Sequence, residues 1–448
     1  MAQITLAQAA AWCGGAIDPK YADVTFYGAN NDTRKIEAGQ LFVALQGARD
    51  GHDFIPMALE KGASAVLCTH CDGDYPAIVV DDTRIALGQI ARGERERLGL
   101  KVVGVTGSVG KSTTKEMIAA VLETSYRVAK TPANHNNDIG MPMAVLSIPE
   151  GTEIAVLEMG MNHFGEISYL TKIAQPDLAV IINIGTMHIE HLGSREGIRQ
   201  AKLEILEGLK PGGKLLLNGD DDMLWPVRDE LKVPYVYFGA ENTACAVRAS
   251  DVIMDHNGLS FRVSAGAERF AVNLALEGRH YVPDALAAIS AGLQLGVSPE
   301  RISEALGCFK NMAGRQEIFE VKGYTIIKDC YNAGTESMAA ALAVLGNKSG
   351  RRIAVLGDML ELGDRAPMEH YRVGTLAARQ ADLLFAYGPN SGKMVQGAAD
   401  HGMEAAYAFE DRQVLAEKLK ETANPGDVLL FKGSHGMHME LALELFLA

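Results

Sequence analysis

A segment near residue 100 constrains the fold of this 448-residue chain more than any other. Residues 102–106 form a short apolar run, residues 107–110 form a glycine-containing turn, and residues 112–124 have a composition typical of a helix. The apolar run does not alternate with polar residues, as expected for a strand of a parallel sheet that is covered on both faces. The segment therefore predicts a strand–loop–helix unit inside an α/β domain.

The turn between this strand and helix has the composition of a phosphate-binding loop. Its glycines let backbone N–H groups converge on phosphate oxygens. Lys111 can reach the terminal phosphates of a nucleotide, and the Ser112 hydroxyl can ligate magnesium. The spacing differs from the usual GxxxxGK(S/T) pattern, because Val105 replaces the first glycine and Gly104 opens the loop instead. An ordinary glycine turn is the alternative, but the Lys-Ser-Thr register favours a nucleoside triphosphate. The candidate nucleotide-binding residues are Gly107, Ser108, Gly110, Lys111, Ser112 and Thr113.

Similar strand-like and helix-like segments recur along the rest of the chain and divide it into three parts. Residues 1–84 contain two short apolar runs around a turn-rich stretch, which predicts a small mixed α/β domain. Residues 85–313 contain the phosphate loop and further apolar runs, which predicts a central doubly wound α/β domain with a P-loop. Residues 314–448 repeat the strand–helix alternation, which predicts a Rossmann-like α/β domain at the C-terminal end.

The overall charge and the lack of long apolar runs limit the partners that this chain can have. The formal net charge is −14, which argues against nucleic acid, because phosphate backbones are held by basic surfaces. No apolar run is long enough to span a bilayer, and the first residues lack the features of a signal peptide. The six cysteines include one isolated CxxC pair, Cys68 and Cys71, and are expected to be reduced thiols. These features predict a cytoplasmic protein without membrane insertion.

Three polar residues of the central region follow predicted strands or lie near them. Glu158 ends the apolar run 154–158, and a carboxylate buried beside a phosphate loop needs a cation such as Mg²⁺. A helix N-cap or a surface acid is the alternative. His188 follows the next apolar run, and Lys202 lies in a helix-like segment with neighbouring acids. Taken alone, such a histidine is typical of a loop, and such a lysine is typical of a solvated helix face.

The order of these motifs resembles the Mur ligases, which form ATP-driven amide bonds in peptidoglycan precursors. The resemblance extends over nearly the whole chain. It rests on the phosphate loop, residues 134–140 (NHNNDIG), residues 158–160 (EMG), His188 and Lys202. Residues 329–333, 357–363 and 432–434 are most similar to the branch of the family that adds D-alanyl-D-alanine. The branch that adds the third amino acid usually carries a DNPR motif, which this sequence lacks.

The resemblance implies an ATP site with two Mg²⁺ ions. Lys111 would hold the β- and γ-phosphates, and Arg315 would stabilise charge on the γ-phosphate during its transfer. The implied metal ligands are Ser112 and Glu158 for one ion, and His188 and a carbamylated Lys202 for the other. Carbamylation would turn the lysine into a carboxylate-like ligand. The implied catalytic residues are Lys111, Lys202, His188 and Arg315.

The resemblance also implies contacts with the rest of the nucleotide. Asn134 and Asn137 would line the reaction centre, while Asp329 and Tyr331 would contact ATP from the C-terminal domain. Near the adenine, the family has His-Asn-x-x-Asn, whereas residues 280–284 of this chain are HYVPD. Both asparagines are therefore replaced, and the candidates at this end of the nucleotide are Tyr281, which would stack on the base, and Asp284.

The N-terminal domain resembles a site for the UDP part of a substrate, with candidate residues Thr33, Arg34, Asp50 and His52. The implied substrates are UDP-N-acetylmuramoyl-tripeptide and D-alanyl-D-alanine, which a monomeric enzyme would join through an acyl phosphate. The sequence leaves open whether the tripeptide ends in diaminopimelate or in lysine. Two other functions also stay open: a Mur-type ligase that adds the third amino acid, and a non-catalytic regulator that binds a nucleotide.

Overall fold

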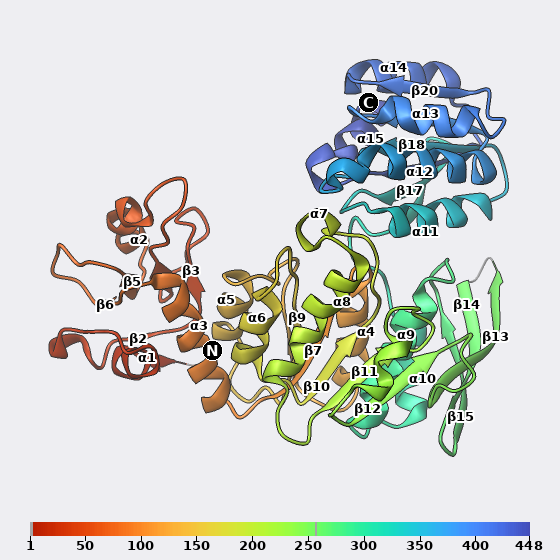
Figure 1. Ribbon diagram of the computed structural model, residues 1–448. Coiled ribbons are helices and arrows are strands. Elements are labelled where there is room, and N and C mark those ends of the chain that lie inside the picture. The colour runs from red at the N-terminus through yellow and green to blue at the C-terminus, as the bar shows by residue number, and fades with distance from the viewer. Residues whose placement is uncertain (1–2, 256–257) are drawn as a thin grey trace.

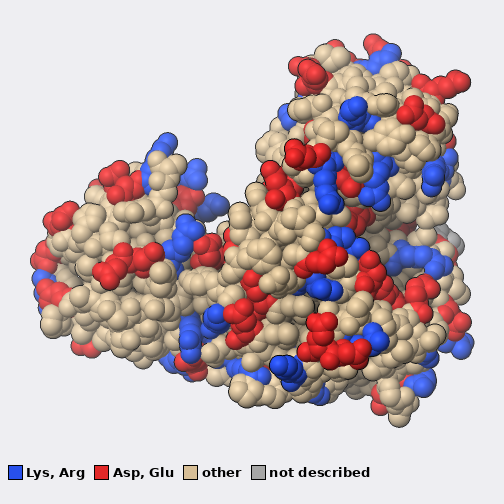
Figure 2. Space-filling model, viewed as in Figure 1, with Lys and Arg blue, Asp and Glu red and all other residues tan. Residues whose placement is uncertain are grey.

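The computed structural model describes residues 3–255 and 258–448, which form three α/β domains in succession (Figure 1). The red and orange N-terminal domain lies at one end of the molecule, the yellow and green central domain follows, and the blue C-terminal domain lies at the other end. This arrangement confirms the predicted α/β class with three domains. The space-filling view shows a hollow between the two outer domains, and acidic and basic side chains are interspersed on this face (Figure 2).

The N-terminal domain contains a small parallel sheet. Within the described residues, this sheet has four short strands in the order β3-β4-β5-β6. The predicted apolar runs form β4 and β5, whose residues are all buried. The strands are β1 (Ile4–Thr5) and β2 (Thr25–Phe26), which form a separate antiparallel pair, and β3 (Ala29–Asn30), β4 (Leu41–Val43), β5 (Ala65–Cys68) and β6 (Ala77–Val79). The helices are α1 (Leu6–Cys13) and α2 (Ile55–Glu60).

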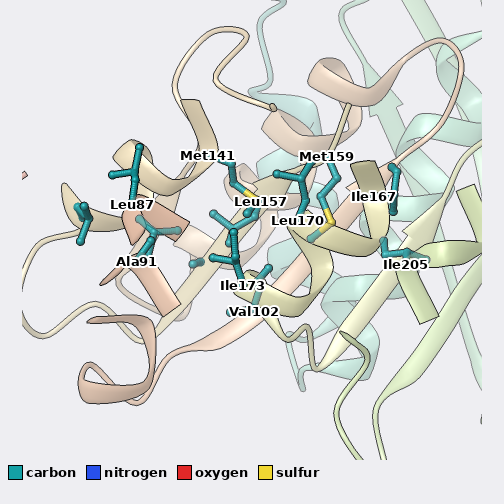
Figure 3. Close-up of a cluster of buried hydrophobic side chains, with 14 of the residues drawn as sticks. Leu87, Ala91, Val102, Met141, Leu157, Met159, Ile167, Leu170, Ile173 and Ile205 are labelled. Atoms are coloured by element: carbon teal, nitrogen blue, oxygen red, sulfur yellow. The ribbon is translucent and has the colours of Figure 1, made fainter. Parts of the chain in front are cut away.

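Helix α3 (Thr83–Arg97) leads from the N-terminal domain into the central domain. Asp82 caps its first turn by accepting hydrogen bonds from two backbone N–H groups. Its buried face includes Leu87 and Ala91, which belong to a hydrophobic cluster that continues to Leu157 in the central sheet (Figure 3). The N-terminal and central domains therefore share one apolar core.

The central sheet carries the phosphate loop. In the described part of the chain it has nine strands, in the order β15-β14-β13-β12-β11-β10-β7-β9-β8. Neighbouring strands are parallel from β8 to β13, whereas β13, β14 and β15 form an antiparallel meander at one edge. The sequence patterns did not predict this meander, because its strands mix buried and exposed residues and form no apolar runs. The strands are β7 (Lys101–Thr106), β8 (Val128–Lys130), β9 (Ile154–Glu158), β10 (Leu178–Ile181), β11 (Lys214–Asn218), β12 (Tyr235–Gly239), β13 (Val247–Asp255), β14 (Gly258–Ala265) and β15 (Glu268–Leu274).

The order of the central strands creates a ligand crevice. Strand β7 lies between β9 and β10, so the chain extends the sheet from β7 in both directions. Such a reversal opens a crevice at the C-terminal ends of the strands. The phosphate loop follows β7, Glu158 ends β9, and Asn183 follows β10, so the topology brings these three segments together. The helices of this domain are α4 (Lys111–Glu123), α5 (Gly140–Leu146), α6 (Glu166–Ala174), α7 (Ile189–Leu192), α8 (Arg195–Leu203), α9 (Tyr281–Gln294) and α10 (Pro299–Gly307).

The C-terminal domain is a second α/β unit with helices on both faces of its sheet. Its described strands follow the order β16-β17-β21-β18-β19-β20, and only β16 is antiparallel to its neighbour. Helices α11, α12 and α13 cover one face, and α14 and α15 cover the other. The strands are β16 (Glu317–Val321), β17 (Tyr324–Asp329), β18 (Arg352–Gly357), β19 (Leu383–Tyr387), β20 (Ala406–Phe409) and β21 (Val428–Lys432). The helices are α11 (Thr335–Gly346), α12 (Ala366–Gln380), α13 (Ser391–Ala399), α14 (Arg412–Thr422) and α15 (Met439–Leu447). None of the helices in the described residues has the length and apolarity needed to cross a membrane.

Candidate functional site

A cavity of about 600 Å³ lies where the crevice of the central sheet meets the C-terminal domain. The phosphate loop and Glu158 form one wall, and Asp329 and Tyr331 of the C-terminal domain contribute to another. Most of the predicted nucleotide and metal residues lie together in its lining. They are Ser108, Gly110, Lys111, Ser112, Thr113, Asn134, Asn137, Glu158, His188, Tyr281, Asp284, Arg315, Asp329 and Tyr331. Gly107 belongs to the same loop without lining the cavity, and Lys202 is almost fully buried nearby.

The phosphate loop is held in place by Asn183. The side-chain oxygen of Asn183 accepts hydrogen bonds from the backbone N–H groups of Ser108 (3.0 Å) and Val109 (2.9 Å). Gly110 ends the loop with φ +85°, a left-handed conformation that favours glycine. A Cβ atom at this position would lie only 2.6 Å from an oxygen of Asp284. The loop is therefore tightly packed, and it directs the first N–H groups of α4 toward the cavity, where they can bind phosphate.

Lys111 lies at the first position of α4 and folds back over the loop. Its ammonium group donates a hydrogen bond to the carbonyl oxygen of Gly107 at 2.9 Å. Burial lowers the pKa of Lys111, and the nearby charge of Glu158 opposes this shift. A lysine in this position carries its charge next to the space that the loop encloses, as a triphosphate site requires.

Glu158 presents an unsatisfied carboxylate oxygen at the end of β9. The side chain is 2% exposed, and its Oε1 atom accepts a hydrogen bond from Nδ2 of Asn136 at 2.8 Å. Its Oε2 atom has no hydrogen-bond partner among the described residues, and the Lys115 ammonium lies 4.0 Å away. Because a buried carboxylate oxygen without a partner is costly, this position suits a bound cation.

His188 and Lys202 lie close to the charge of Lys111. Burial, followed by the Lys111 charge, lowers the pKa of His188 to about 4. The same two causes lower the pKa of Lys202, which is 2% exposed, far below its usual range. The His188 Nδ1 atom lies 2.8 Å from Oε2 of Glu361, in an orientation that gives no hydrogen bond. Neutral imidazole is the form that ligates metals, and a neutral amine is the form of lysine that reacts with carbon dioxide.

The described residues contain no group of three or more His, Cys, Asp or Glu side chains arranged as a metal site. Mg²⁺ is usually held by one or two carboxylates together with substrate phosphates and water. The unpartnered oxygen of Glu158 and the hydroxyl of Ser112 at the phosphate loop suit this type of binding.

Arg315 joins the C-terminal side of the cavity to the phosphate loop. Its Nη2 group donates a hydrogen bond to the Ser112 hydroxyl at 2.9 Å, and the guanidinium lies 4.0 Å from the centre of the Tyr331 ring. This stacking is a favourable cation–π geometry that fixes the plane of the guanidinium. The Nε atom is buried and has no partner within the described residues, so Arg315 keeps a donor for an anion in the cavity.

The two residues predicted to lie near the adenine, Tyr281 and Asp284, are both buried and hydrogen-bonded to other side chains. The Tyr281 hydroxyl accepts a hydrogen bond from Nδ2 of Asn311 at 2.6 Å, and the residue is 4% exposed. Asp284 accepts a hydrogen bond from the Thr114 hydroxyl at 2.9 Å, and burial raises the pKa of its carboxyl group to about 7. Asp284 therefore packs under the phosphate loop and its helix.

The four predicted UDP residues lie in the N-terminal domain. Arg34 is largely exposed and pairs with Asp32, while the His52 ring accepts a hydrogen bond from the backbone N–H of Thr69 and contacts Asp50. A second cavity, of about 630 Å³, lies between the N-terminal and central domains. None of the four residues lines this cavity in the described chain. Its lining includes their neighbours Asn30, Asn31, Asp32 and Lys35, together with Lys130 and His135 of the central domain.

Several polar residues of the main cavity were not predicted from the sequence. Asn136 and Asn183 orient Glu158 and the phosphate loop, and both lie in segments that already carried candidate residues. Glu336 of α11 accepts a hydrogen bond from the Thr186 hydroxyl at 3.0 Å. Glu336 approaches the central domain only because the C-terminal domain packs there, so local sequence patterns gave no signal for it. Glu361 lies in residues 357–363, a segment that the resemblance had singled out, but no role was predicted for it.

Comparisons with known proteins place this arrangement in a family. Residues 25–95 match the Mur ligase family catalytic domain, residues 105–292 match the Mur ligase middle domain, and residues 314–435 match the Mur ligase glutamate ligase domain. A UDP-N-acetylmuramoyl-tripeptide–D-alanyl-D-alanine ligase of Bacillus subtilis is 41% identical, and the alignment covers 95% of this chain and 94% of that protein.

Solved structures agree with the sequence matches. A crystal structure of MurF from Acinetobacter baumannii has a TM-score of 0.92 and 33% identity, and the superposition covers 100% of this chain and 99% of that one. A MurF ligase from Thermotoga maritima, solved in complex with ADP, has a TM-score of 0.83 and 30% identity and covers 94% and 97% of the two chains. The matches extend over all three domains and over the residues that surround the main cavity. The chain belongs to the Mur ligase family.

Proposed function

We propose that this protein is an ATP- and Mg²⁺-dependent ligase that joins D-alanyl-D-alanine to UDP-N-acetylmuramoyl-tripeptide in the cytoplasm. The observation that carries the proposal is the convergence of Lys111, Glu158 and Arg315 on one cavity between two domains. Phosphoryl transfer to a carboxylate requires neutralisation of the triphosphate, which Lys111 and Arg315 can provide directly and Glu158 can provide by holding a cation. The B. subtilis relative is a UDP-N-acetylmuramoyl-tripeptide–D-alanyl-D-alanine ligase, which supports the choice of the two substrates.

The reaction consists of two substitutions. The terminal carboxylate of the tripeptide attacks the γ-phosphorus of ATP, a new O–P bond forms, and ADP leaves. The amino group of D-alanyl-D-alanine then attacks the carbonyl carbon of the acyl phosphate and loses a proton, and inorganic phosphate leaves as the C–O bond breaks. ATP is needed because a carboxylate is a poor electrophile, whereas an acyl phosphate reacts readily with an amine.

Residues of both the central and the C-terminal domain contribute to phosphoryl transfer in the cavity. The N–H groups of the phosphate loop and Lys111 hold the β- and γ-phosphates. Arg315, oriented by Tyr331 and Ser112, offsets the charge that develops on the transferring phosphoryl group. Magnesium, when bound, would reduce the repulsion between the carboxylate and the triphosphate. Ser112 and Glu158 would hold one ion, and His188 and carbamylated Lys202 would hold another.

The remaining predicted residues surround the ends of the substrates. Asp329 and Tyr331 would contact the nucleotide from the C-terminal domain, Asn134 and Asn137 would line the reaction centre, and Tyr281 would stack on the base. Thr33, Arg34, Asp50 and His52 would support UDP binding in the N-terminal domain. The cavity between the N-terminal and central domains suits the diphosphate, because Lys35 and Lys130 line it.

One observation favours a second candidate function. The side chains that replace the adenine motif already have hydrogen-bond partners within the protein. Tyr281 is hydrogen-bonded to Asn311, and Asp284 is hydrogen-bonded to Thr114. A protein that binds a nucleotide without turnover, as a regulator, would tolerate such a change. The complete set of Lys111, Glu158, His188 and Lys202 favours the ligase over this alternative.

Substrate-dependent ATP turnover tests the proposed function. Purified protein is mixed with ATP and Mg²⁺, and ADP formation is measured with the tripeptide substrate, with D-alanyl-D-alanine, and with both. We expect sustained turnover only with both substrates, and a product whose mass equals that of the two joined molecules less water. Lys111→Ala serves as the inactive control. Binding of ATP without turnover under all conditions would favour the regulator.

A further inference from the structure

Helix α4 contains a fully buried lysine, Lys115, that the proposed reaction does not use. Lys115 lies four residues after Lys111, so the two side chains leave the same face of the helix. The side chain is 0% exposed, and lysine is rarely buried to this extent unless its charge has a partner. An apolar residue could fill the same space at a lower cost, so the charge itself needs an explanation.

Buried groups fix the ammonium group of Lys115 beside Glu158. Its Nζ atom donates a hydrogen bond to the carbonyl oxygen of Thr131 at 2.6 Å and lies 4.0 Å from Oε2 of Glu158. The Thr131 hydroxyl accepts a hydrogen bond from the backbone N–H of Glu158 at 3.0 Å. Thr131 therefore holds both charged residues and sets the separation between the ammonium group and the carboxylate.

A second acid, Glu116, neutralises the Lys115 charge only in part. Its Oε1 atom lies 3.2 Å from Nζ of Lys115, but its Oε2 atom lies 2.6 Å from Nζ of Lys130. Glu116 is thus shared between two lysines. Part of the Lys115 charge therefore remains to act on Glu158 and on any ion that Glu158 holds.

Two further cations act on the same carboxylate from the side of the cavity. Burial lowers the pKa of Lys111, the charge of Glu158 opposes this shift, and the charge of Arg315 adds to it, so these three charges interact. Together with Lys115, three cationic side chains therefore lie near Glu158. Such a site attracts a triphosphate and opposes the entry of a free divalent cation.

We propose that Lys115 is a positioning residue whose charge opposes the binding of a divalent cation at Glu158 until the nucleotide is bound. The inference rests on the proposed function, in which Glu158 holds Mg²⁺. An ion about 2.1 Å from Oε2 lies within about 6 Å of the Lys115 ammonium group. At about 6 Å, repulsion between a divalent and a single charge changes the affinity about tenfold even with the dielectric constant of water. The negative charges of the triphosphate offset this repulsion, so the metal binds with the nucleotide or after it.

The test measures metal binding and nucleotide binding separately in the full-length protein. Electron paramagnetic resonance follows Mn²⁺ binding without nucleotide, and calorimetry follows ATP binding in the presence of EDTA. Lys115→Met keeps the apolar stem and removes the charge. It should tighten Mn²⁺ binding at least about tenfold and weaken metal-free ATP binding at least about threefold. Lys101→Met is the matched control, because Lys101 is exposed at the start of β7, and it should change neither affinity.

The opposite signs of the two changes separate a charge effect from a structural defect, which would weaken the binding of both ligands. If either change is absent or has the other sign in Lys115→Met, the inference is wrong and the proposed function stands. The double variant Lys115→Met/Glu158→Gln should lose the gain in Mn²⁺ affinity. If it keeps the gain, Glu158 does not hold the metal ion, and the metal site of the proposed function fails as well.

A second variant covers the case in which Lys115→Met does not fold. Lys115→Gln keeps an N–H donor for the Thr131 carbonyl and carries no charge. The same two changes, tighter Mn²⁺ binding and weaker metal-free ATP binding, are expected for it, and affinities equal to those of the wild-type protein would overturn the inference.

Discussion

The two junctions between the domains are built differently. The N-terminal and central domains share a hydrophobic cluster that runs from Ile4 through Leu87 of α3 to Leu217. The described buried clusters of the C-terminal domain contain no residue of the other domains. Its contacts with the central domain include hydrogen bonds and ion pairs, such as Arg315 with Ser112 and Lys348 with Glu277. The junction between the N-terminal and central domains is part of a hydrophobic core. The junction with the C-terminal domain has no shared core, and hydrogen bonds and ion pairs contribute to it.

This difference shows how the protein can combine a fixed site with a movable one. The phosphate loop and Glu158 are fixed, because they follow neighbouring strands of one sheet. Arg315 and Tyr331 belong to the side that can be repositioned, because few apolar contacts would break if the C-terminal domain moved. Closure of such a domain excludes water, which would otherwise hydrolyse an acyl phosphate.

The largest effect on activity is expected at Glu158, on the side of the site that the central sheet forms. Glu158→Gln should reduce ligase activity about 10³-fold, because the phosphate site would lose the carboxylate that we propose binds the metal. The same change should destabilise the ligand-free protein by about 1–2 kcal/mol, because the buried Lys115 ammonium loses the carboxylate that lies 4.0 Å away. Activity assays and chemical denaturation measure the two effects. Glu153→Gln, an exposed acid just before the same strand, should change neither, and unaltered activity in Glu158→Gln would contradict the assignment.

The two junctions should also differ in their unfolding. Leu87→Ala should destabilise the N-terminal and central domains together by about 3 kcal/mol, because Leu87 is fully buried in their common core. Leu342→Ala, a fully buried leucine of α11, should destabilise the C-terminal domain alone. Hydrogen exchange measured for each domain separates these outcomes. Loss of protection in all three domains from either variant would show that the second junction is as cohesive as the first.

The third prediction concerns Lys202, the proposed ligand of the second metal ion. Lys202→Ala should lower activity about 10²-fold, because the proposed carbamate ligand is lost, and added formate or acetate should restore part of the activity. Lys172→Ala removes an exposed lysine from α6 and should show neither the loss nor the rescue. Full activity of Lys202→Ala without any added acid would exclude a role of Lys202 at the metal site.

The smallest expected effect concerns Asp284, which packs under the phosphate loop. Because burial raises the pKa of its carboxyl to about 7, the group is neutral below that pH and negative above it. The KM for ATP should therefore rise about threefold between pH 6 and pH 8, and Asp284→Asn should abolish this rise.

The raised pKa of Asp284 also makes the stability of the folded protein depend on pH. The folded protein binds the Asp284 proton more tightly than the unfolded chain does. The corresponding stability is fully present below about pH 4 and is lost as the pH rises through about 7. Asp284→Asn should flatten this part of the stability profile, and an unchanged profile would show that the carboxyl titrates in its usual range.

The sequence predicted the parts of the site that depend on local order along the chain. The phosphate loop and Glu158 could be predicted, because strand ends of a parallel sheet meet at one edge. Asn136 lay in a motif that was already singled out, yet its contact with Glu158 depends on the pairing of separate segments. The contacts of Glu336 and Glu361 could not be predicted, although Glu361 lies in the motif 357–363, because they depend on how the C-terminal domain packs on the central one.

Two features were hardest to predict from the sequence: the strands at the edge of the central sheet, and the residues that line the cavity beside the N-terminal domain. The meander of β13, β14 and β15 has no continuous apolar run, since one face of each strand is open to solvent. The UDP candidates Thr33 and His52 were chosen by resemblance, and their neighbours Asp32 and Lys35 line the adjoining cavity instead. Predicting which residue of a loop faces a cavity requires the backbone path, which a motif does not contain.

In the proposed reaction, a carboxylate attacks the γ-phosphate of ATP in the cavity between the phosphate loop and Arg315. Oxygen-18 placed in the terminal carboxylate of the tripeptide tests it directly. We expect one labelled oxygen to appear in inorganic phosphate for each amide bond formed, as measured by mass spectrometry. Amide formation with unlabelled phosphate would contradict it.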